Sequence, residues 1–593
     1  MRLNDANLKN YDHLSTSVLI FTVAVIPLIV HLKMIPVNAE VLHYWNSFVN
    51  GDFFSYYKSL SIYGAAFLTS CLMVIRRVSL RKLPHFIPMS ILIVCVILST
   101  HFSPHPYTSV HGFPDRYEGA YVLLSYIVLL MGASTLIKET RSLKAITVSL
   151  MISAAVIGTI GLFQYFGVDF YQTGVGRFLV DFSQGSFTNT VNNQSNGLGK
   201  AVYGSLYNPN AFGMYMSMLF PFTLFMALFT KRKTTKILLG VLACLLFADL
   251  LASFSRGSLI GAMVAVFITA LLVRRRLLIH WRQGIGMVVL CGLIFFVMNI
   301  VSIGALGHRV ESLVAVDQGH LEDQQIDKVK DFKIKGRELS LYCTKSVLKV
   351  KSTGSGLSFY DDNNQEIDTY AIGGNGTYGL TDDRYKHFVI NINNNLLKIK
   401  KGKSFLYFRV LDQTFAFLDA RGEAEALTPV QKFGFKGFER IGSGRGYIWS
   451  RTLPVLSRSL IIGKGPDTFA LEFPQQDYKG KLRYMYDAYI IIDKPHNMYL
   501  QTALNTGLVM LFAMLGIFCL YLYRSGRTLI RGNSDDWYSM SATAIFAAVV
   551  AYLISGLFTD STVSVAPVFW VLLGLGSKII SLEKPMAPLG FRN

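Results

Sequence analysis

Long apolar runs alternate with short polar connections over most of the chain, interrupted by one long polar stretch between residues 305 and 496. A helix needs about 20 mostly apolar residues to cross the hydrocarbon core of a bilayer. The runs therefore predict about twelve membrane-spanning helices. Their ranges are 15–33, 59–75, 84–101, 120–137, 145–165, 209–230, 237–254, 258–273, 284–304, 497–523, 538–558 and 563–580.

Basic residues gather in alternate connections between these runs. Cytoplasmic loops collect Lys and Arg because these residues resist translocation. With the N-terminus inside, every basic group falls on the cytoplasmic side, which predicts an N-in, C-in topology. The groups are Arg76, Arg77, Arg81 and Lys82; Lys138, Arg141 and Lys144; Lys231, Arg232, Lys233 and Lys236; Arg274, Arg275, Arg276 and Arg282; and Arg524, Arg527 and Arg531. The outer segments are then 34–58, 102–119, 166–208 and 305–496.

Within the long outer segment the pattern changes from helical to strand-like. Between residues 339 and 418, short runs such as "LSLYC", "HFVININ" and "SFLYFRV" are separated by turn formers such as "GGNGTYG" and "KKGK". This spacing predicts a small antiparallel β-sandwich. The turn "DDNNQ" loosely resembles a calcium loop, but hairpin turns are rich in Asp and Asn for backbone reasons alone.

These patterns predict an α-helical polytopic membrane protein with an extracytoplasmic strand-rich insertion. The expected N-terminal membrane part covers 1–304 with about nine spans, and the insertion covers 305–440. An outer juxtamembrane segment follows at 441–496, where "GRGYIWSRTLPVLSRS" has amphipathic helical spacing. The C-terminal membrane part covers 497–593 with about three spans.

Composition supports the membrane class. Hydrophobic residues make up 51% of the 593 and charged residues 16%, whereas soluble domains are roughly 25% charged. The net charge of +20 does not predict a nucleic-acid partner, because the cations lie in the connections between apolar runs. Most of the 6 cysteines lie in apolar runs, which argues against a disulfide framework. The N-terminal "MRLNDANLKNYDHLS" lacks a cleavable signal-peptide pattern.

Two polar motifs of the first half fall on the outer side. In "GSLYNPNAFGMYM", Asn208 and Asn210 flank a proline at the start of a span, where Asn208 would cap a helix. In "SFSRG", Arg256 lies between two apolar runs. A cation there either extends to lipid headgroups or needs an anionic partner.

Two further motifs follow the strand-like segment. "GSGRGYIWSRTLPVLSRSLIIGKGPDTF" places Arg445 four residues before Trp449, and its Gly-rich turn at 463–465 is a weak signal for phosphate binding. "KPHNMYLQTALNTG" places His496 and Asn497 at the outer start of a span. A histidine at this position either hydrogen-bonds a loop or contacts a substrate.

Taken in this order on one side of the membrane, the motifs resemble the O-antigen ligase and polymerase family. In that family a "G…NPN", an "S.SRG", an "R…W…G.G" and an "HN.YL…G" segment recur, and "PDRYEG" at 114–119 also looks like a family feature. The resemblance covers about 115 to 560. It implies a GT-C-like glycosyltransferase that moves a glycan from a polyprenyl diphosphate to an acceptor hydroxyl, with no metal or other cofactor.

The resemblance implies that Arg256, Arg445 and His496 are the catalytic residues. Guanidinium groups bind phosphate oxygens in bidentate geometry and stay cationic, so the two arginines would stabilise the departing lipid diphosphate. The histidine would receive the acceptor proton or orient the hydroxyl. The residues expected to bind substrate are Asn208, Asn210, Arg116, Asn497 and Arg451.

The expected location is the cytoplasmic membrane of a bacterium, with the active site facing outward. The expected partners are the lipid bilayer, a polyprenyl-diphosphate-linked oligosaccharide donor, and a glycan, lipid or protein acceptor. Ligase and polymerase activity both remain open. Residues 305–430 depart from the mainly helical outer loop usual in ligases of the family, which leaves the acceptor open.

Three other functions are considered beside the transferase. One is a transporter or flippase of lipid-linked glycan, and another is a receptor that uses the inserted domain. A metal enzyme built on His101, His105 and His111 is the third, although no carboxylate joins these histidines at ligand spacing.

Overall fold

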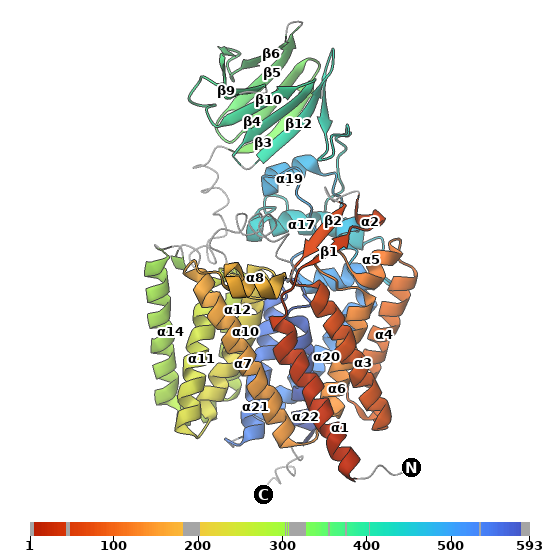
Figure 1. The fold of residues 1–593 in the computed structure, drawn as a ribbon, viewed down its shortest axis with the longest axis vertical. Helices are drawn as coiled ribbons and strands as arrows, with labels where there is room; N and C mark the ends of the chain where they lie inside the picture. The colour runs from red at the N-terminus through yellow and green to blue at the C-terminus, as the bar shows by residue number, and fades with distance from the viewer. Residues whose placement is uncertain are drawn as a thin grey trace, which may run out of the picture.

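The apolar runs form one bundle of helices, and the strand-rich segment forms a β domain above it (Figure 1). The computed structural model describes residues 5–42, 48–181, 202–302, 304, 306–307, 328–353, 356–373, 376–402, 404–532 and 535–582. The bundle helices are α1 (Asp5–Ile20), α3 (Tyr56–Ile75), α4 (Phe86–His101), α6 (Ala120–Thr135), α7 (Thr140–Tyr165), α10 (Pro209–Phe229), α11 (Lys233–Ala252), α12 (Arg256–Leu272), α14 (Trp281–Val301), α20 (Met498–Arg531), α21 (Trp537–Ser555) and α22 (Ala566–Leu582). The short α13 (Arg274–Ile279) joins α12 to α14.

Many of these helices have the length and composition of membrane spans. In the described part of the chain, 8 helices are long and apolar enough to cross a membrane. The apolar helices α4, α6, α12 and α22 stand at the other predicted positions, but they are shorter than the usual span of about 20 residues. The chain therefore has the architecture of a multi-pass membrane protein.

The first span lies earlier in the chain than predicted. It covers Asn10–Leu28 rather than 15–33, and strand β1 (Lys33–Pro36) begins where the span was expected to end. The helix includes polar residues before position 15, and one of them is paired: Asp12 Oδ1 lies 2.7 Å from Arg76 Nη2. At its other end the helix tightens into a 3-10 turn, Ile26–Leu28, that contains a proline.

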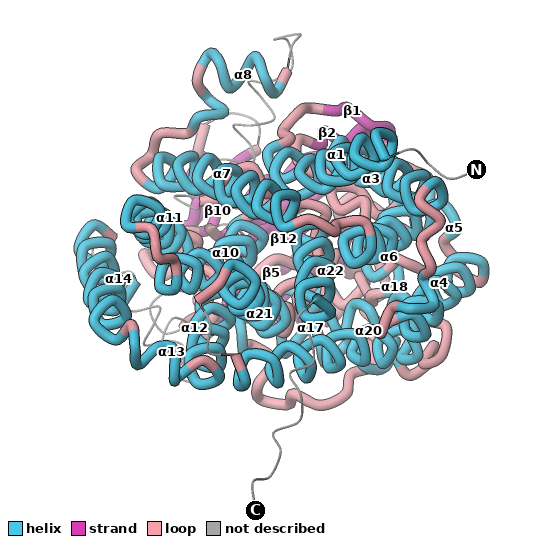
Figure 2. Tube along the Cα trace, turned by 90° about the horizontal axis from the view of Figure 1, so that it is seen from below, coloured by secondary structure: helices cyan, strands magenta, loops and turns pink. Residues whose placement is uncertain are grey.

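Helix α10 occupies the interior of the bundle. All residues of its apolar stretch are buried, and the helix packs against α11, α12 and α21. By contrast, only 6% of the apolar stretch of α14 is buried, and α14 lies at the periphery in Figure 2. A helix that is apolar on every face is either enclosed by protein or exposed to lipid, and these two helices represent the two cases.

A layer of short elements lies between the bundle and the β domain (Figure 1). An antiparallel hairpin pairs β1 with β2 (Val49–Asp52). The short helices are α2 (Ala39–Leu42), α5 (Pro106–His111), α8 (Gly174–Val180), α17 (Ile441–Leu456), α18 (Phe469–Glu472) and α19 (Tyr478–Met485). The start of α1 and the end of α22 lie at the opposite end of the bundle.

The β domain consists of two antiparallel sheets around one core. Their strand orders are β13-β12-β11-β10-β9-β8 and β3-β4-β5-β6-β7. Alternate residues such as Leu339, Leu341 and Ile390 are buried in the shared core, as the sequence pattern predicts. The domain begins at Val329 rather than at 339, because Phe332 of the first strand completes the core. The strands are β3 (Val329–Lys335), β4 (Glu338–Cys343), β5 (Val347–Thr353), β6 (Gly356–Tyr360), β7 (Glu366–Ile367), β8 (Thr369–Ala371), β9 (Thr377–Leu380), β10 (Phe388–Asn393), β11 (Leu396–Lys401), β12 (Ser404–Val410) and β13 (Phe415–Leu418).

Helix α19 attaches the β domain to the layer of short elements. Leu482 belongs to the same buried core as the strands. Arg483 Nη2 lies 2.6 Å from Asp331 Oδ2 on β3. The β domain is thus held on the layer of short elements by both apolar packing and an ion pair.

Candidate functional site

Arg256 stands at the tight turn between α11 and α12. Phe254 has a φ of 51°, so the chain reverses within a few residues. Ser253 Oγ accepts the Ser255 N–H at 3.2 Å, and Ser255 Oγ lies 2.8 Å from Ser258 Oγ. The serines of "SFSRGS" therefore fasten the turn. The Arg256 side chain is exposed, and it makes no ion pair or hydrogen bond with any described residue.

Two glycines allow distant segments to approach this turn. A Cβ on Gly213, near the start of α10, would lie 2.7 Å from Ser255 Cβ. A Cβ on Gly257 would lie 3.0 Å from Phe558 Cγ, in the loop between α21 and α22. Such distances are too short for real side-chain contacts, so the motif glycines are required for close packing.

Arg445 reaches the same region from α17, just after the left-handed residue Gly442. Its Nη1 donates to the Gly442 carbonyl at 2.6 Å, and its Nη2 donates to the Phe558 carbonyl at 2.9 Å. Its buried Nε has no hydrogen-bond partner among the described residues. Burial lowers the pKa of Arg445; the nearby Asp560 carboxylate opposes this shift, and the nearby Arg256 guanidinium adds to it.

Arg256 and Arg445 are therefore two like charges close enough to repel each other. No carboxylate pairs with Arg256 in the described chain. Two guanidinium groups with free donors suit a ligand that carries more than one negative oxygen, such as a phosphate or a diphosphate.

The His496 ring is held by a carboxylate that the sequence analysis did not single out. Asp560, in the loop between α21 and α22, places Oδ2 3.2 Å from His496 Nδ1, and its Oδ1 accepts the Asn497 N–H at 3.2 Å. Burial by itself raises the pKa of Asp560, but His496, Arg116 and Lys494 lower it, to about 2. Asp560 therefore stays charged at neutral pH and lies beside Nδ1, which leaves Nε2 as the ring nitrogen for a substrate.

Bonds on both sides fix the backbone at His496. Asn497 caps α20, and its Oδ1 accepts two N–H groups of the first turn at 3.0 and 2.9 Å. Trp449 Nε1 on α17 donates to the Pro495 carbonyl at 2.7 Å. His496 itself has a φ of 51°, which is unfavourable for a residue with a side chain. This conformation is retained because both neighbours are bonded.

Arg116 is buried behind the His496–Asp560 pair. Its Nε donates to Asp467 Oδ1 at 2.7 Å, and Asp467 Oδ2 also accepts the Phe113 N–H at 2.8 Å. Burial works against the Arg116 charge, but the carboxylates of Asp467 and Asp560 raise the pKa of Arg116 above its usual value. Arg116 is thus placed to support the Asp560 charge rather than to meet a ligand directly.

The remaining predicted substrate-binding residues differ in their surroundings. Arg451 Nε donates to Asp477 Oδ2 at 3.0 Å, and its guanidinium lies over the Tyr447 ring. Its charge is therefore neutralised within the layer of short elements. Asn208 caps α10, as predicted, by accepting the Ala211 N–H at 2.9 Å. Asn210 is partly exposed on the first turn of the same helix.

The Gly-rich turn at 463–465 has a structural role. Helix α20 is interrupted at Gly507, which has a φ of 88°. The backbone N–H groups of residues 464 and 465 donate to the carbonyls of Leu504 and Asn505 at 3.0 and 2.7 Å. The turn supplies donors to carbonyls that the interruption would otherwise leave unbonded, and this accounts for its glycines without a phosphate.

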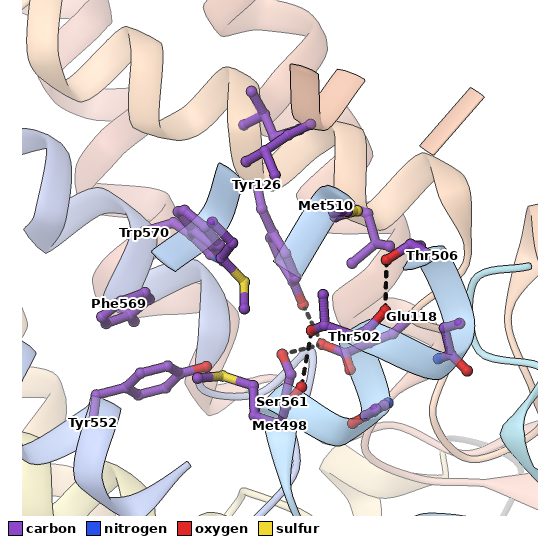
Figure 3. A pocket seen from close by; sticks show the side chains of 16 residues that line it. Glu118, Tyr126, Met498, Thr502, Thr506, Met510, Tyr552, Ser561, Phe569 and Trp570 are labelled. Carbon is purple, nitrogen blue, oxygen red and sulfur yellow. Dashed lines mark hydrogen bonds between the residues drawn. The ribbon is translucent and has the colours of Figure 1, made fainter. Parts of the chain in front are cut away.

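A cavity of about 60 Å³ adjoins this cluster inside the bundle (Figure 3). Glu118 lies at its polar end, where its Oε1 accepts hydrogen bonds from Ser561 Oγ at 2.7 Å and Tyr126 OH at 2.9 Å. Burial raises the pKa of Glu118 to about 7, although Arg116 opposes the shift. A carboxyl that changes protonation near neutral pH therefore lies close to Asp560. The rest of the lining includes Met498, Met510, Phe569 and Trp570.

The histidines considered for a metal site have other neighbours. His105 Nε2 lies 3.3 Å from Glu472 Oε1, and His111 Nδ1 lies 3.1 Å from the Tyr107 carbonyl. Over the described ranges, no group of three or more His, Cys, Asp or Glu side chains is placed to hold a metal ion.

Asp560 is the most important member of the cluster that was not predicted. It lies in "LFTDSTV", a short connection between the last two predicted spans on the outer side. An acidic residue at the end of an apolar run is the signal that could have identified it, since charged groups at membrane depth need partners. The basic side chains of the sequence motifs are the expected partners of such an acidic residue.

Searches against protein-family models and against curated proteins find no match to this chain. The function proposed for it therefore depends on the arrangement of these residues and on the motif resemblance.

Proposed function

We propose that this protein is a metal-independent glycosyltransferase that moves a glycan from a polyprenyl diphosphate onto an acceptor hydroxyl. The observation that carries the proposal is that Arg256 lies close to Arg445, and Arg445 lies close to the Asp560 carboxylate that contacts His496. The two arginines suit an anionic leaving group. The histidine with its carboxylate suits a hydroxyl that must lose a proton.

The two arginines would receive the diphosphate. Arg256 is exposed and unpaired within the described chain, so it can meet the donor first. Arg445 is held by the Phe558 carbonyl and keeps a free Nε donor. As the bond between the sugar carbon and the diphosphate oxygen breaks, negative charge grows on the leaving group. Guanidinium groups already in position stabilise that charge.

His496 would act on the acceptor. As the acceptor oxygen bonds to the sugar carbon, its proton passes to His496 Nε2, and Asp560 stabilises the imidazolium that forms. The proton then leaves with the lipid diphosphate or to water. One carbon–oxygen bond forms and one breaks, so the transfer needs no oxidant or reductant.

The proposal includes a membrane arrangement. We expect twelve spans in a GT-C-like arrangement, with both termini in the bacterial cytoplasm and the site facing outward. The basic connections support this orientation, and the β domain lies at the end of the bundle opposite the start of α1 and the end of α22. The β domain is then on the side where an acceptor would arrive.

The test is turnover by the purified full-length protein. Lipid-linked oligosaccharide is added, and the release of polyprenyl diphosphate and the size of the product are measured. Arg256→Gln should lose donor binding, whereas Arg458→Gln, in the turn after α17, is a matched control that should retain it. Donor binding by Arg256→Gln at the wild-type level would overturn the proposal. Product ladders would indicate a polymerase, and single additions a ligase.

A transporter of lipid-linked glycan is the second candidate, and one residue favours it. Asp249 on α11 is fully buried, and both of its carboxyl oxygens lack hydrogen-bond partners among the described residues. Unpaired acidic residues inside membrane bundles often mark proton-coupled transport. In proteoliposomes, Asp249→Asn should abolish translocation if the protein is a transporter, and should leave glycan transfer unchanged if it is the proposed transferase.

A further inference from the structure

A second cavity lies near the ends of α3 and α22, at the end of the bundle away from the β domain. Its volume is about 760 Å³, and its walls come from the ends of α3, α6, α20 and α22 and from the connection into α4. No acidic side chain of the described residues lines it. Its basic lining residues are Arg76, Arg77, His85, Lys138, Arg524 and Lys578.

The described chain neutralises little of this positive charge. Arg76 pairs with Asp12 at 2.7 Å. The other Lys and Arg side chains of the lining form no ion pair with described residues; they are Arg77, Lys138, Arg524 and Lys578. Four cations that share one cavity repel one another, and an anion bound among them would remove that repulsion.

A buried hydrogen-bonding group also faces this cavity. His85 is 2% exposed, and its Nε2 lies 3.1 Å from Ser577 Oγ. Its Nδ1 has no partner among the described residues. Ser577 Oγ donates to the Leu573 carbonyl at 2.9 Å, so Nε2 carries the ring proton and Nδ1 is an acceptor. A buried polar atom without a partner costs free energy, and a hydroxyl of a lipid headgroup in the cavity would satisfy it.

We infer that this cavity binds the phosphate group of an anionic lipid. The preference of cytoplasmic loops for Lys and Arg explains why cations occur at this end, but it does not require four unpaired cations around one half-open cavity. Basic pockets between membrane helices bind anionic headgroups. Val78, Leu83 and Ile580 also line the cavity, which suits the start of an acyl chain better than a free inorganic ion.

The test measures binding to the full-length protein in zwitterionic detergent and needs no enzymatic readout. The probes are short-chain phosphatidylglycerol, phosphatidylcholine with the same chains, and inorganic phosphate. The cavity variant carries Arg524→Gln and Lys578→Gln. The matched control carries Arg274→Gln and Arg275→Gln, two exposed cations of α13 that do not line the cavity.

Phosphatidylglycerol should bind the wild type more tightly than phosphatidylcholine does. Its Kd should rise about 30-fold in the cavity variant, because each cation near an anionic headgroup contributes about fivefold, and should not change in the control. Equal weakening in both variants would mean that only general surface charge acts, and would overturn the inference. Inorganic phosphate binding as tightly as the lipid would overturn the lipid assignment. If the double variant does not unfold cooperatively, Arg77→Gln is measured in its place.

Discussion

Replacing Asp560 by Asn would test the centre of the proposed site. Asn keeps the shape of the side chain but removes the charge that faces His496 Nδ1 at 3.2 Å. The pKa of Asp560 is lowered from 3.8 to about 2, which corresponds to roughly 2–3 kcal/mol of stabilisation. Because the folded-state pKa is the lower one, this stabilisation is present above pH 3.8 and is lost as the pH falls through about 2. At pH 7 the substitution should lower the free energy of unfolding by roughly that amount.

The same substitution should affect catalysis more than donor binding. An amide cannot stabilise the imidazolium that forms when His496 accepts the acceptor proton. Turnover should therefore fall on the order of 10²–10⁴-fold. The donor is held by Arg256 and Arg445 in the proposal, so its affinity should be nearly unchanged.

Two assays separate these effects. Unfolding by denaturant is followed by intrinsic fluorescence in detergent, and turnover per folded molecule is followed by release of polyprenyl diphosphate. Asp477→Asn is a matched control, since it breaks the ion pair with Arg451 without touching the histidine. It should cost stability but retain turnover. If Asp560→Asn were less stable but turned over at the wild-type rate, Asp560 would have only a structural role.

The remaining predictions concern other members of the same cluster. Arg256→Lys and Arg445→Lys should each weaken donor binding by about 10–100-fold in titrations with lipid-linked oligosaccharide, because an ammonium cannot replace bidentate hydrogen bonds; wild-type affinity would contradict the diphosphate assignment. Gly257→Ala should cost about 1–3 kcal/mol in chemical unfolding through overpacking against Phe558, and an unchanged midpoint would contradict the close approach. The free energy of unfolding should decrease between about pH 4.5 and pH 7, because folded Glu118, with its pKa raised to about 7, keeps a proton that the unfolded chain has released. Glu118→Gln should remove this part of the pH dependence, and a pH dependence identical to that of the wild type would refute the raised pKa of Glu118.

Much of the fold could be predicted because it depends on patterns that are local in sequence. Continuous apolar runs give the bundle helices, and period-two alternation gives the strands of the β domain. The errors occur where tertiary contacts decide the ends of an element. The first span begins earlier than predicted because Asp12 pairs with Arg76. The β domain has one more strand than predicted because Phe332 fills its core.

The candidate site was predictable only in part. The motif resemblance selected Arg256, Arg445 and His496. The structure brings Arg445 and His496 near Asp560, and Arg256 near Arg445. Local sequence does not reveal which cations have partners. Arg451 reads like Arg256 in the sequence, but it is neutralised by Asp477. Such pairings join residues that are far apart in the chain, so no local pattern encodes them.

The interruption of α20 at Gly507 has a mechanical consequence for the proposed chemistry. The upper piece of α20 follows directly from His496, and residues 464 and 465 bond it to the segment that continues from α17. The histidine and Arg445 are therefore connected through residues 460–465. The lower piece of α20 is bonded to the same segment, because the Leu508 N–H donates to the Leu460 carbonyl at 2.7 Å, and it packs against α4, α21 and α22. A tilt of the lower piece in a thinner or thicker bilayer would therefore be passed through residues 460–465 to the spacing between the proton acceptor and the guanidinium.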